Sequence, residues 1–388
     1  MTNQKIRLAQ SGAKDARQAV AEFHATVAQP DMGLVLFFCS SEYDLDVLAA
    51  EMNRLFIGVQ VVGCTTAGEI GPAGYFQHSL SGASFPSDSC VAVSGLLERL
   101  SQFEIAKGHD FAQGLLQELE SKAPQVSPEN SFALMLIDGL SVREEPVTHA
   151  IQYALGKITL FGGSAGDDQQ FRKTYVFNEG RFHADCAVLI LINTVLPFRM
   201  FKTQHFVSTD ERLVVTEADT ATRTVKEING LPAAAEYARL VGVDVHELNP
   251  MRFAAAPVVV IIDGTDYVRS IQKANPDGSL TFFCAIEEGV VFRVAHGVGL
   301  VMNLEQTFDK IRAELGKPQL VIGCDCILRK LEVTQYGLNE RVAELFRSNN
   351  TIGFNSYGEQ FHGVHVNQTL TGIAIGSAPV STGDQRNA

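Results

Sequence analysis

The sequence predicts an α/β (α+β) fold with mixed sheets, made of two related modules that contain internally repeated strand-helix-strand units. A glycine-rich motif occurs near both ends of the chain, at residues 63–69 and 353–359, and a weaker copy lies between them at residues 162–167. In each copy an apolar run, an amphipathic segment and a second apolar run precede the glycines. A repeated motif bears directly on the fold, because each copy of a repeat corresponds to one structural unit.

Each copy carries the same succession of elements. In the first, the apolar run 34–39 precedes apolar side chains at helical spacing from Leu45 to Leu55, and residues 57–62 lead into the glycines. Apolar residues three or four positions apart indicate an amphipathic helix. Near-continuous apolar strands with helices between them predict sheets covered by helices. The other copies repeat this order at residues 132–137, 147–155 and 158–160, and at residues 320–324, 342–346 and 351–352.

A second signature follows each Gly-Glu pair at the same offset. It is Ser79-Leu80-Ser81-Gly82 in the first copy and Thr369-Leu370-Thr371-Gly372 in the last. Because both signatures recur in one register, we interpret them as internal duplication.

Local signals organise the rest of the chain. Helical spacing at residues 16–27 and 109–120 predicts two further helices. A boundary between residues 197 and 224 precedes a short helix and a region richer in antiparallel strands, in which Asn275-Pro276-Asp277-Gly278 is a strong turn signal. We therefore predict an N-terminal module at residues 28–224 and a C-terminal module at residues 225–376. The region after the boundary contains a predicted helix at residues 233–240 and predicted strands at residues 257–263, 281–286 and 290–294.

Composition bounds the class of protein. The chain has 388 residues, of which 46% are hydrophobic and 19% charged, as in an ordinary globular protein. The net charge of −13 argues against nucleic acid or an anionic membrane surface as the main partner. No run is apolar enough to span a bilayer, and the first residues lack the apolar stretch of a signal peptide. We expect a cytoplasmic protein.

The seven cysteines lie mostly in apolar strand patterns, and their number is odd. This favours buried, reduced thiols. Cys324 and Cys326 are close in sequence and share one face of a strand. A structural role is the default for this pair, and a redox or metal-binding role stays open.

Taken together, the motifs resemble those of FIST-domain proteins, in which an N-terminal and a C-terminal FIST module occur together. The resemblance covers about residues 28–376 and implies a ligand-binding sensor of bacterial signal transduction, not an enzyme. The residues that carry it are Gly63-Cys64-Thr65-Thr66-Ala67-Gly68-Glu69-Ile70, Phe161-Gly162-Gly163-Ser164-Ala165-Gly166-Asp167-Asp168, Asn229-Gly230-Leu231-Pro232-Ala233 and Gly353-Phe354-Asn355-Ser356-Tyr357-Gly358-Glu359.

The same resemblance implies a cofactor and a partner. Family members of the NosP type bind haem b, sense nitric oxide and regulate a histidine kinase or a cyclic-di-GMP enzyme. The alternative is a FIST protein that binds an amino acid or another small metabolite without haem. The oligomeric state stays open, and a homo-oligomer is among the alternatives.

A haem iron needs an axial ligand, which is often histidine. His205 is the first candidate, because it lies at the module boundary in segment 198–206, which offers aromatic walls and two cations. The next candidates are His296, His362 and His365. For each of them the alternative is a hydrogen-bonded structural histidine.

The glycine motifs are the second candidate site. Glycine lets the backbone approach a ligand closely, so Gly68 with Glu69 and Gly358 with Glu359 are candidate ligand-binding residues at a cleft between the modules. The alternative is a structural turn whose glutamate caps local amides. Three similar copies favour the structural alternative, since one ligand needs at most two of them.

An enzyme is a third alternative. Asp138 and Asp263 end apolar strands, where α/β enzymes often place acids. Both also precede glycine, which suits a turn, and we prefer the turn. No His-Glu-x-x-His motif is present.

Overall fold

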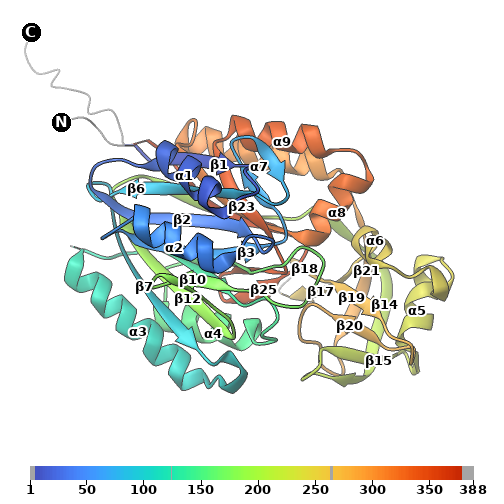
Figure 1. Cartoon of the computed structure of the whole chain (residues 1–388). Coiled ribbons are helices and arrows are strands. Elements are labelled where there is room, and N and C mark those ends of the chain that lie inside the picture. The colour runs from blue at the N-terminus through green and yellow to red at the C-terminus, as the bar shows by residue number, and fades with distance from the viewer. Residues whose placement is uncertain (1–4, 124, 263–264, 378–388) are drawn as a thin grey trace, which may run out of the picture.

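The computed structural model describes residues 5–123, 125–262 and 265–377 (Figure 1). These residues form an α/β protein with three six-stranded sheets and one eight-stranded sheet. The three smaller sheets form a body from three copies of one unit, and the larger sheet belongs to a domain inserted into the third copy. The predicted fold class and the predicted internal repetition are confirmed.

The three copies have the same order of elements. Each begins with an edge strand and a helix, continues through strand, helix and strand to a short hairpin, and ends with a return strand. The first contains β1 (Arg7–Ser11), α1 (Ala16–Val27), β2 (Met32–Ser40), α2 (Leu45–Leu55), β3 (Gln60–Thr66), β4 (Glu69–Gly71), β5 (Gly74–Phe76) and β6 (Leu80–Pro86). The second contains β7 (Cys90–Glu98), η1 (Leu100–Gln102), α3 (Ile105–Lys122), β8 (Ser131–Ile137), α4 (Glu144–Leu155), β9 (Leu160–Ser164), β10 (Val176–Asn178), β11 (Arg181–His183) and β12 (Cys186–Thr194). The third contains β13 (Phe198–Thr203), α7 (Leu300–Leu315), β22 (Leu320–Cys326), α8 (Ile327–Gln335), α9 (Asn339–Ser348), β23 (Thr351–Ser356), β24 (Glu359–Phe361), β25 (Val364–Val366) and β26 (Leu370–Ile375).

The hairpins are exchanged between copies in a closed ring. Hairpin β4–β5 of the first copy pairs with β23 of the third, and hairpin β24–β25 of the third pairs with β9 of the second. Hairpin β10–β11 of the second copy pairs with β3 of the first. Each sheet therefore takes its last two strands from another copy, and the sheet orders are β1-β6-β2-β3-β10-β11, β7-β12-β8-β9-β24-β25 and β13-β26-β22-β23-β4-β5.

The three sheets share one core, and helices cover their outer faces (Figure 1). Phe38 on β2, Leu134 on β8 and Phe354 on β23 meet in that core, where the rings of Phe38 and Phe354 are 4.8 Å apart. On the outside, α1 and α2 pack on the first sheet, α3 and α4 on the second, and α7 and α9 on the third. The helices predicted at residues 16–27 and 45–55 form with these bounds. Asp15 and Asp44 are their N-cap residues, and the carboxylate of each accepts a hydrogen bond from a backbone amide of the first turn.

The repeated glycine has one physical cause in all three copies. A Cβ at Gly63, Gly162 or Gly353 would lie 2.4, 2.2 or 1.9 Å from a carbonyl oxygen of the neighbouring parallel strand. The second signature behaves alike, since a Cβ at Gly82 or Gly372 would lie 2.2 Å from a carbonyl oxygen of the neighbouring antiparallel strand. Both signatures therefore mark close approach of two strands, which excludes any side chain.

The inserted domain has its own core and lies between β13 and α7 (Figure 1). The predicted boundary at 224/225 falls at the start of β15, inside the hairpin formed with β14. The sequence prediction divided the chain into two consecutive modules, whereas the structure places the third copy, on both sides of the insertion, with the first two. The domain contains β14 (Phe206–Asp219), β15 (Thr224–Ile228), β16 (Leu231–Pro232), α5 (Ala233–Val241), η2 (Val245–Glu247), α6 (Pro250–Ala255), β17 (Val258–Ile262), β18 (Thr265–Arg269), β19 (Ile271–Ala274), β20 (Leu280–Phe282) and β21 (Val291–Gly297).

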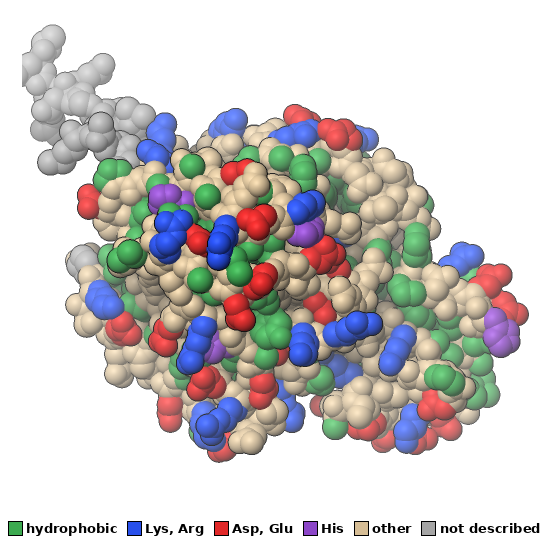
Figure 2. Space-filling view, viewed as in Figure 1, with side chains coloured by type: hydrophobic (Ala, Val, Ile, Leu, Met, Phe, Trp, Pro, Cys, Tyr) green, Lys and Arg blue, Asp and Glu red, His purple; other side chains and the backbone are tan. Residues whose placement is uncertain are grey.

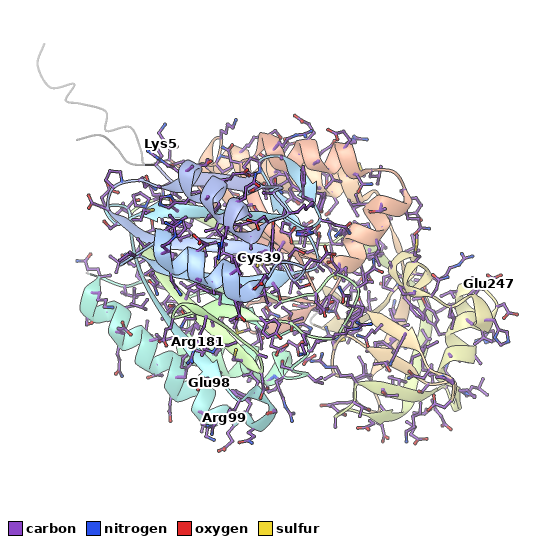
Figure 3. All side chains as sticks on the ribbon, viewed as in Figure 1. Lys5, Cys39, Glu98, Arg99, Arg181 and Glu247 are labelled. Atoms are coloured by element: carbon purple, nitrogen blue, oxygen red, sulfur yellow. The ribbon has the colours of Figure 1, made fainter. Side chains whose placement is uncertain are left out.

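Two further expectations bear on the whole chain. All seven cysteines are buried and free, as predicted. Figure 3 shows one of them, Cys39, inside the body, and Glu247 at the outer edge of the inserted domain. Within the described ranges, no helix combines the length and the apolar character needed to cross a membrane.

Candidate functional site

The three glycine motifs meet at the carboxyl ends of the parallel strands. The amide of Ala67 donates to the carbonyl of Asn355 at 2.9 Å, and the amide of Asn355 donates to Gly68 at 2.7 Å. The middle motif is tied to the last by the amide of Ser164, which donates to Gly358 at 2.8 Å. Ligands of α/β proteins often bind beyond this end of the strands. The three glycine motifs therefore come together at the end of the body where a ligand site is expected.

Glu69 and Glu359 are fully buried and make the same contacts in their two copies. Glu69 accepts from the Ser79 hydroxyl at 2.8 Å, and Glu359 accepts from the Thr369 hydroxyl at 2.7 Å. Burial raises the pKa of Glu69 to about 7 and that of Glu359 to about 8. These carboxyls join the glycine turn to the second signature, which is a structural role. Their predicted ligand-binding role stays a prediction.

Gly68 and Gly358 are enclosed by side chains. A Cβ at Gly68 would lie 2.4 Å from Nζ of Lys330, and one at Gly358 would lie 2.3 Å from Cε1 of His365. The Lys330 ammonium donates to the Ala67 carbonyl at 2.6 Å, and burial lowers its pKa. Lys330 lies on α8, for which the sequence analysis predicted no helix.

A cavity of about 310 Å³ opens beside this junction, between the body and the inserted domain. Figure 2 shows the inserted domain as a separate lobe, with a hollow between it and the body and Lys and Arg side chains beside the hollow. The rings of Phe171 and Tyr357, from the body, stack 4.6 Å apart and line the cavity. Phe283 of the inserted domain lies 5.9 Å from Phe171 and completes this aromatic wall.

Arg223 of the inserted domain also lines this cavity and is 6% exposed. Its Nη2 donates to Glu144 at 2.6 Å and to Glu145 at 2.5 Å, both on α4, and its Nη1 donates to the Phe283 carbonyl at 2.8 Å. Burial raises the pKa of Glu144 to about 7, against the opposing effect of the Arg223 charge. The Nε of Arg223 is buried and has no hydrogen-bond partner in the part of the chain that the structure describes. No sequence motif marks this arginine, so the sequence analysis missed it.

His205 is buried in a polar network on the other side of α8. Its Nε2 lies 2.8 Å from a carboxylate oxygen of Glu332, and its Nδ1 lies 3.2 Å from Nη1 of Arg329. Burial lowers the pKa of His205, so the neutral ring donates through Nε2 and accepts through Nδ1. Arg329 continues the network to Asp325 at 2.7 Å. Both ring nitrogens are thus engaged.

The other three candidate histidines lie on two parts of the fold, β21 and the β24–β25 hairpin. His296 and His362 are exposed, on β21 and at the turn between β24 and β25. His365 is buried, its Nδ1 lies 3.3 Å from the Gln360 amide, and burial lowers its pKa to about 4. The Nε2 of His365 has no partner.

These positions do not fit a haem ligand at a cavity wall. Five cavities of about 260 to 600 Å³ are among those that open on the described part of the chain, and no histidine lines any of these five. Segment 198–206 does line a cavity through residues 199–204, as expected of its aromatic and cationic side chains, but His205 faces the buried network instead. Within the described ranges, no three His, Cys, Asp or Glu side chains are grouped to hold a metal ion.

Asp138 is occupied by the turn that it begins. Its carboxylate accepts from the amide of Leu140 at 3.0 Å, from the amide of Asp185 at 2.6 Å and from the hydroxyl of Thr174. This agrees with the preferred structural interpretation. Asp263, the other candidate acid, lies outside the described residues.

The fold and the site define an α/β protein of three copies of one unit, with a ligand-sized cavity against an inserted domain. Sequence comparison assigns this chain to a known family. The chain belongs to the FIST family: the FIST N domain model matches residues 33–231 and the FIST C domain model matches residues 233–362. FIST domains are generally sensor domains of signal transduction.

Individual relatives are distant. An uncharacterised protein of Methanocaldococcus jannaschii, MJ1623, is 22% identical over 351 residues, which cover 81% of this chain and 67% of the relative. Among solved structures, cyanuric acid hydrolase from A. caulinodans matches with a TM-score of 0.32 and 9% identity, covering 52% of this chain and 72% of that one. A second cyanuric acid hydrolase structure matches with a TM-score of 0.31 and 11% identity, covering 76% of this chain and all of the other. Similarity at this level carries no statement about activity.

Proposed function

We propose that this protein is a cytoplasmic sensor that binds a small metabolite without haem, in the cavity between the body and the inserted domain. One observation carries the proposal. Arg223 lines that cavity, and its buried Nε has no hydrogen-bond partner among the described residues. A buried donor without an acceptor costs on the order of 1–3 kcal/mol, and a ligand that supplies the acceptor removes this cost.

The chemistry of the wall describes the ligand. An acceptor such as a carboxylate oxygen meets Arg223, and a flat or apolar group lies against Phe171, Phe283 and Tyr357. Lys273, which is exposed at the same cavity, adds a second cation. An amino acid or a small carboxylic acid with an apolar or aromatic part has this composition.

The position of the cavity supplies a route to signalling. Its wall comes from both parts of the fold, so a bound ligand contacts both at once and favours one arrangement of the two. The proposed output is the regulation of a histidine kinase or a cyclic-di-GMP enzyme by this arrangement. The protein itself performs no reaction under this proposal.

A thermal-shift screen of amino acids and small carboxylic acids tests the site. A bound ligand raises the melting temperature. The variant Phe171→Ala removes one aromatic wall and should abolish the shift. Phe76→Ala, at an exposed phenylalanine of β5, is the matched control and should retain it. A ligand that stabilises wild type and Phe171→Ala equally would place its site elsewhere.

The haem-binding, nitric-oxide-sensing form of the sensor stays a separate prediction. Haem would supply the iron that binds nitric oxide, and one of the four candidate histidines would hold it. The contacts of His205 and the absence of a histidine from the five cavity walls do not fit this role. The proposal therefore takes the haem-free alternative.

A further inference from the structure

A second cavity, of about 480 Å³, lies between β13 and α7 and is lined by cations of both elements. Arg199 and Lys202 come from β13, and Lys310 comes from α7. No acidic residue is among the described residues that line it. The chain as a whole carries a net charge of −13, so this cavity is positively charged on a protein that is negatively charged overall.

The cations are only partly neutralised by the protein. Arg199 forms an ion pair with Glu314, whereas Lys202 and Lys310 form none among the described residues. The Lys202 ammonium lies 4.3 Å from the centre of the Tyr267 ring. Burial and the nearby charge of Arg269 lower the pKa of Lys202. Lys202 is half-buried, whereas Arg199 and Lys310 are exposed, and an anion between the three would offset the repulsion of their charges.

The remaining wall suits a small oxyanion. Asn303 and Gln306 carry side-chain amides, and Thr307 carries a hydroxyl, all on the face of α7 that lines the cavity. The two amides donate hydrogen bonds to oxygen acceptors, whereas the Thr307 hydroxyl already donates to the Asn303 carbonyl at 2.9 Å. Phe201 and Ile311 supply apolar surface beside them. The volume lies in the range of small-molecule sites.

We infer that this cavity binds a small multivalent oxyanion, with carboxylate or phosphate groups held by Lys202, Lys310 and Arg199. This site is distinct from the cavity of the proposed function, because no residue lines both. It also lies at both connections of the inserted domain, since β13 leads into β14 and α7 follows β21. An anion here bridges the strand that enters the insertion and the helix that leaves it.

Calorimetric titration of the full chain with pyrophosphate and, separately, with citrate tests the inference at constant ionic strength. Wild type should bind at least one of the two saturably. Lys202→Met and Lys310→Met should each weaken this binding at least about tenfold, which is the loss of about 1.4 kcal/mol. Lys317→Met makes the same change of charge at an exposed loop residue between α7 and β22 and should leave the affinity unchanged.

The two probes separate the sources of the anion. Binding of pyrophosphate alone assigns phosphate groups to the ligand, and binding of citrate alone assigns carboxylates. Absence of saturable binding of either anion up to about 10 mM would overturn the inference. So would equal weakening by Lys317→Met, because the effect would then be general screening of charge.

Two controls guard the interpretation. Lys310→Gln keeps a polar side chain on an exposed helix position and should fold, so loss of binding in this variant reports the charge itself. Phe171→Ala, in the other cavity, should bind the anion as wild type does. If Phe171→Ala loses the metabolite and keeps the anion, the two sites are independent, and failure at one leaves the other standing. Loss of the anion in Phe171→Ala would contradict the present assignment.

Discussion

Arg223 of the inserted domain donates from Nη2 to a carboxylate oxygen of Glu144 at 2.6 Å, across 79 residues of sequence. Both side chains are buried, and Glu145 shares the same guanidinium at 2.5 Å. This ion pair joins α4 of the body to the inserted domain at the edge of the proposed ligand cavity. Its energetic contribution can be measured.

Arg223→Met should destabilise the protein strongly. The variant leaves two carboxyls of α4 without their cation, and breaking a buried pair costs about 3–5 kcal/mol. Denaturant unfolding measures the loss. Arg239→Met is the matched control, because Arg239 pairs with Glu236 while its own side chain is 64% exposed. Such a pair contributes about 0.2–1 kcal/mol. Equal losses of unfolding free energy in the two variants would show that the buried pair stabilises the protein no more than the exposed one.

His205→Ala should destabilise the protein by about 1–3 kcal/mol, because Arg329 and Glu332 lose a buried partner. His205→Gln should recover part of this loss by donating to Glu332. The exposed His296→Ala is the control and should change the free energy of unfolding by less than about 0.5 kcal/mol. Thermal and denaturant unfolding both report the difference. An unchanged His205→Ala would mean that the network contributes nothing net.

Addition of hemin should produce no Soret band that depends on His205, since both nitrogens of its ring are engaged in the folded protein. Absorbance spectra of wild type and His205→Ala with hemin should therefore coincide. The contrary result is well defined. A band that shifts with nitric oxide, disappears in His205→Ala and persists in His296→Ala, His362→Ala and His365→Ala would establish His205 as the iron ligand.

Glu359→Gln should reduce the pH dependence of stability. The pKa of Glu359 is raised by burial from 4.5 to about 8, so the folded protein holds a proton that the unfolded chain releases. The stabilisation is complete below pH 4.5 and is lost as the pH rises toward 8, at up to about 1.4 kcal/mol per unit of pKa difference. Glutamine mimics the protonated acid. Urea unfolding at pH 5 and pH 8 should therefore differ less in the variant, and an identical difference would contradict the assignment.

Gly162→Ala should destabilise the protein by about 1–3 kcal/mol or more, because its Cβ would lie 2.2 Å from the Met135 carbonyl oxygen. Gly114→Ala is the matched control. Gly114 lies inside helix α3, and nothing lies within 4 Å of an added Cβ, so alanine should stabilise by up to about 1 kcal/mol. If Gly162→Ala lowers the free energy of unfolding and Gly114→Ala raises it, the loss at Gly162 comes from close packing and not from backbone entropy. A mild effect at Gly162 would show that the strands can separate.

The repeated unit could be predicted because its elements are local. Apolar runs and helical spacing define β2, α2 and β3 at residues 32–66. The turn predicted at residues 275–278 forms, although β19, the strand before it, was not predicted. Helix α7 was missed, although Leu300, Leu304 and Phe308 are spaced for one buried face. The exchange of hairpins could not be predicted, since strand partners distant in sequence leave no local pattern.

The candidate site was likewise predictable only where its signals are local in the sequence. Glu69 and Glu359 were recognised through the motif, and their structural alternative was stated, but their burial depends on packing between copies. Arg223 stands in a polar turn whose sequence gives no sign of Glu144 and Glu145 beyond it. His205 was chosen for its neighbours in sequence, whereas its neighbours in space are Arg329 and Glu332. A side chain's partners follow from the tertiary fold, which one sequence does not reveal.

The exchanged hairpins impose an order on biosynthesis. As the chain leaves the ribosome, the first sheet is complete once β11 ends at residue 183, but hairpin β4–β5 has no strand to join until β23 appears at residue 351. The edge of β9 stays open until β24 follows at residue 359. A fragment that stops before residue 351 therefore carries unpaired edges, which invite association with other chains. The ring closes last, once β23 and β24 have been made, and until then the earlier copies keep open edges that favour aggregation.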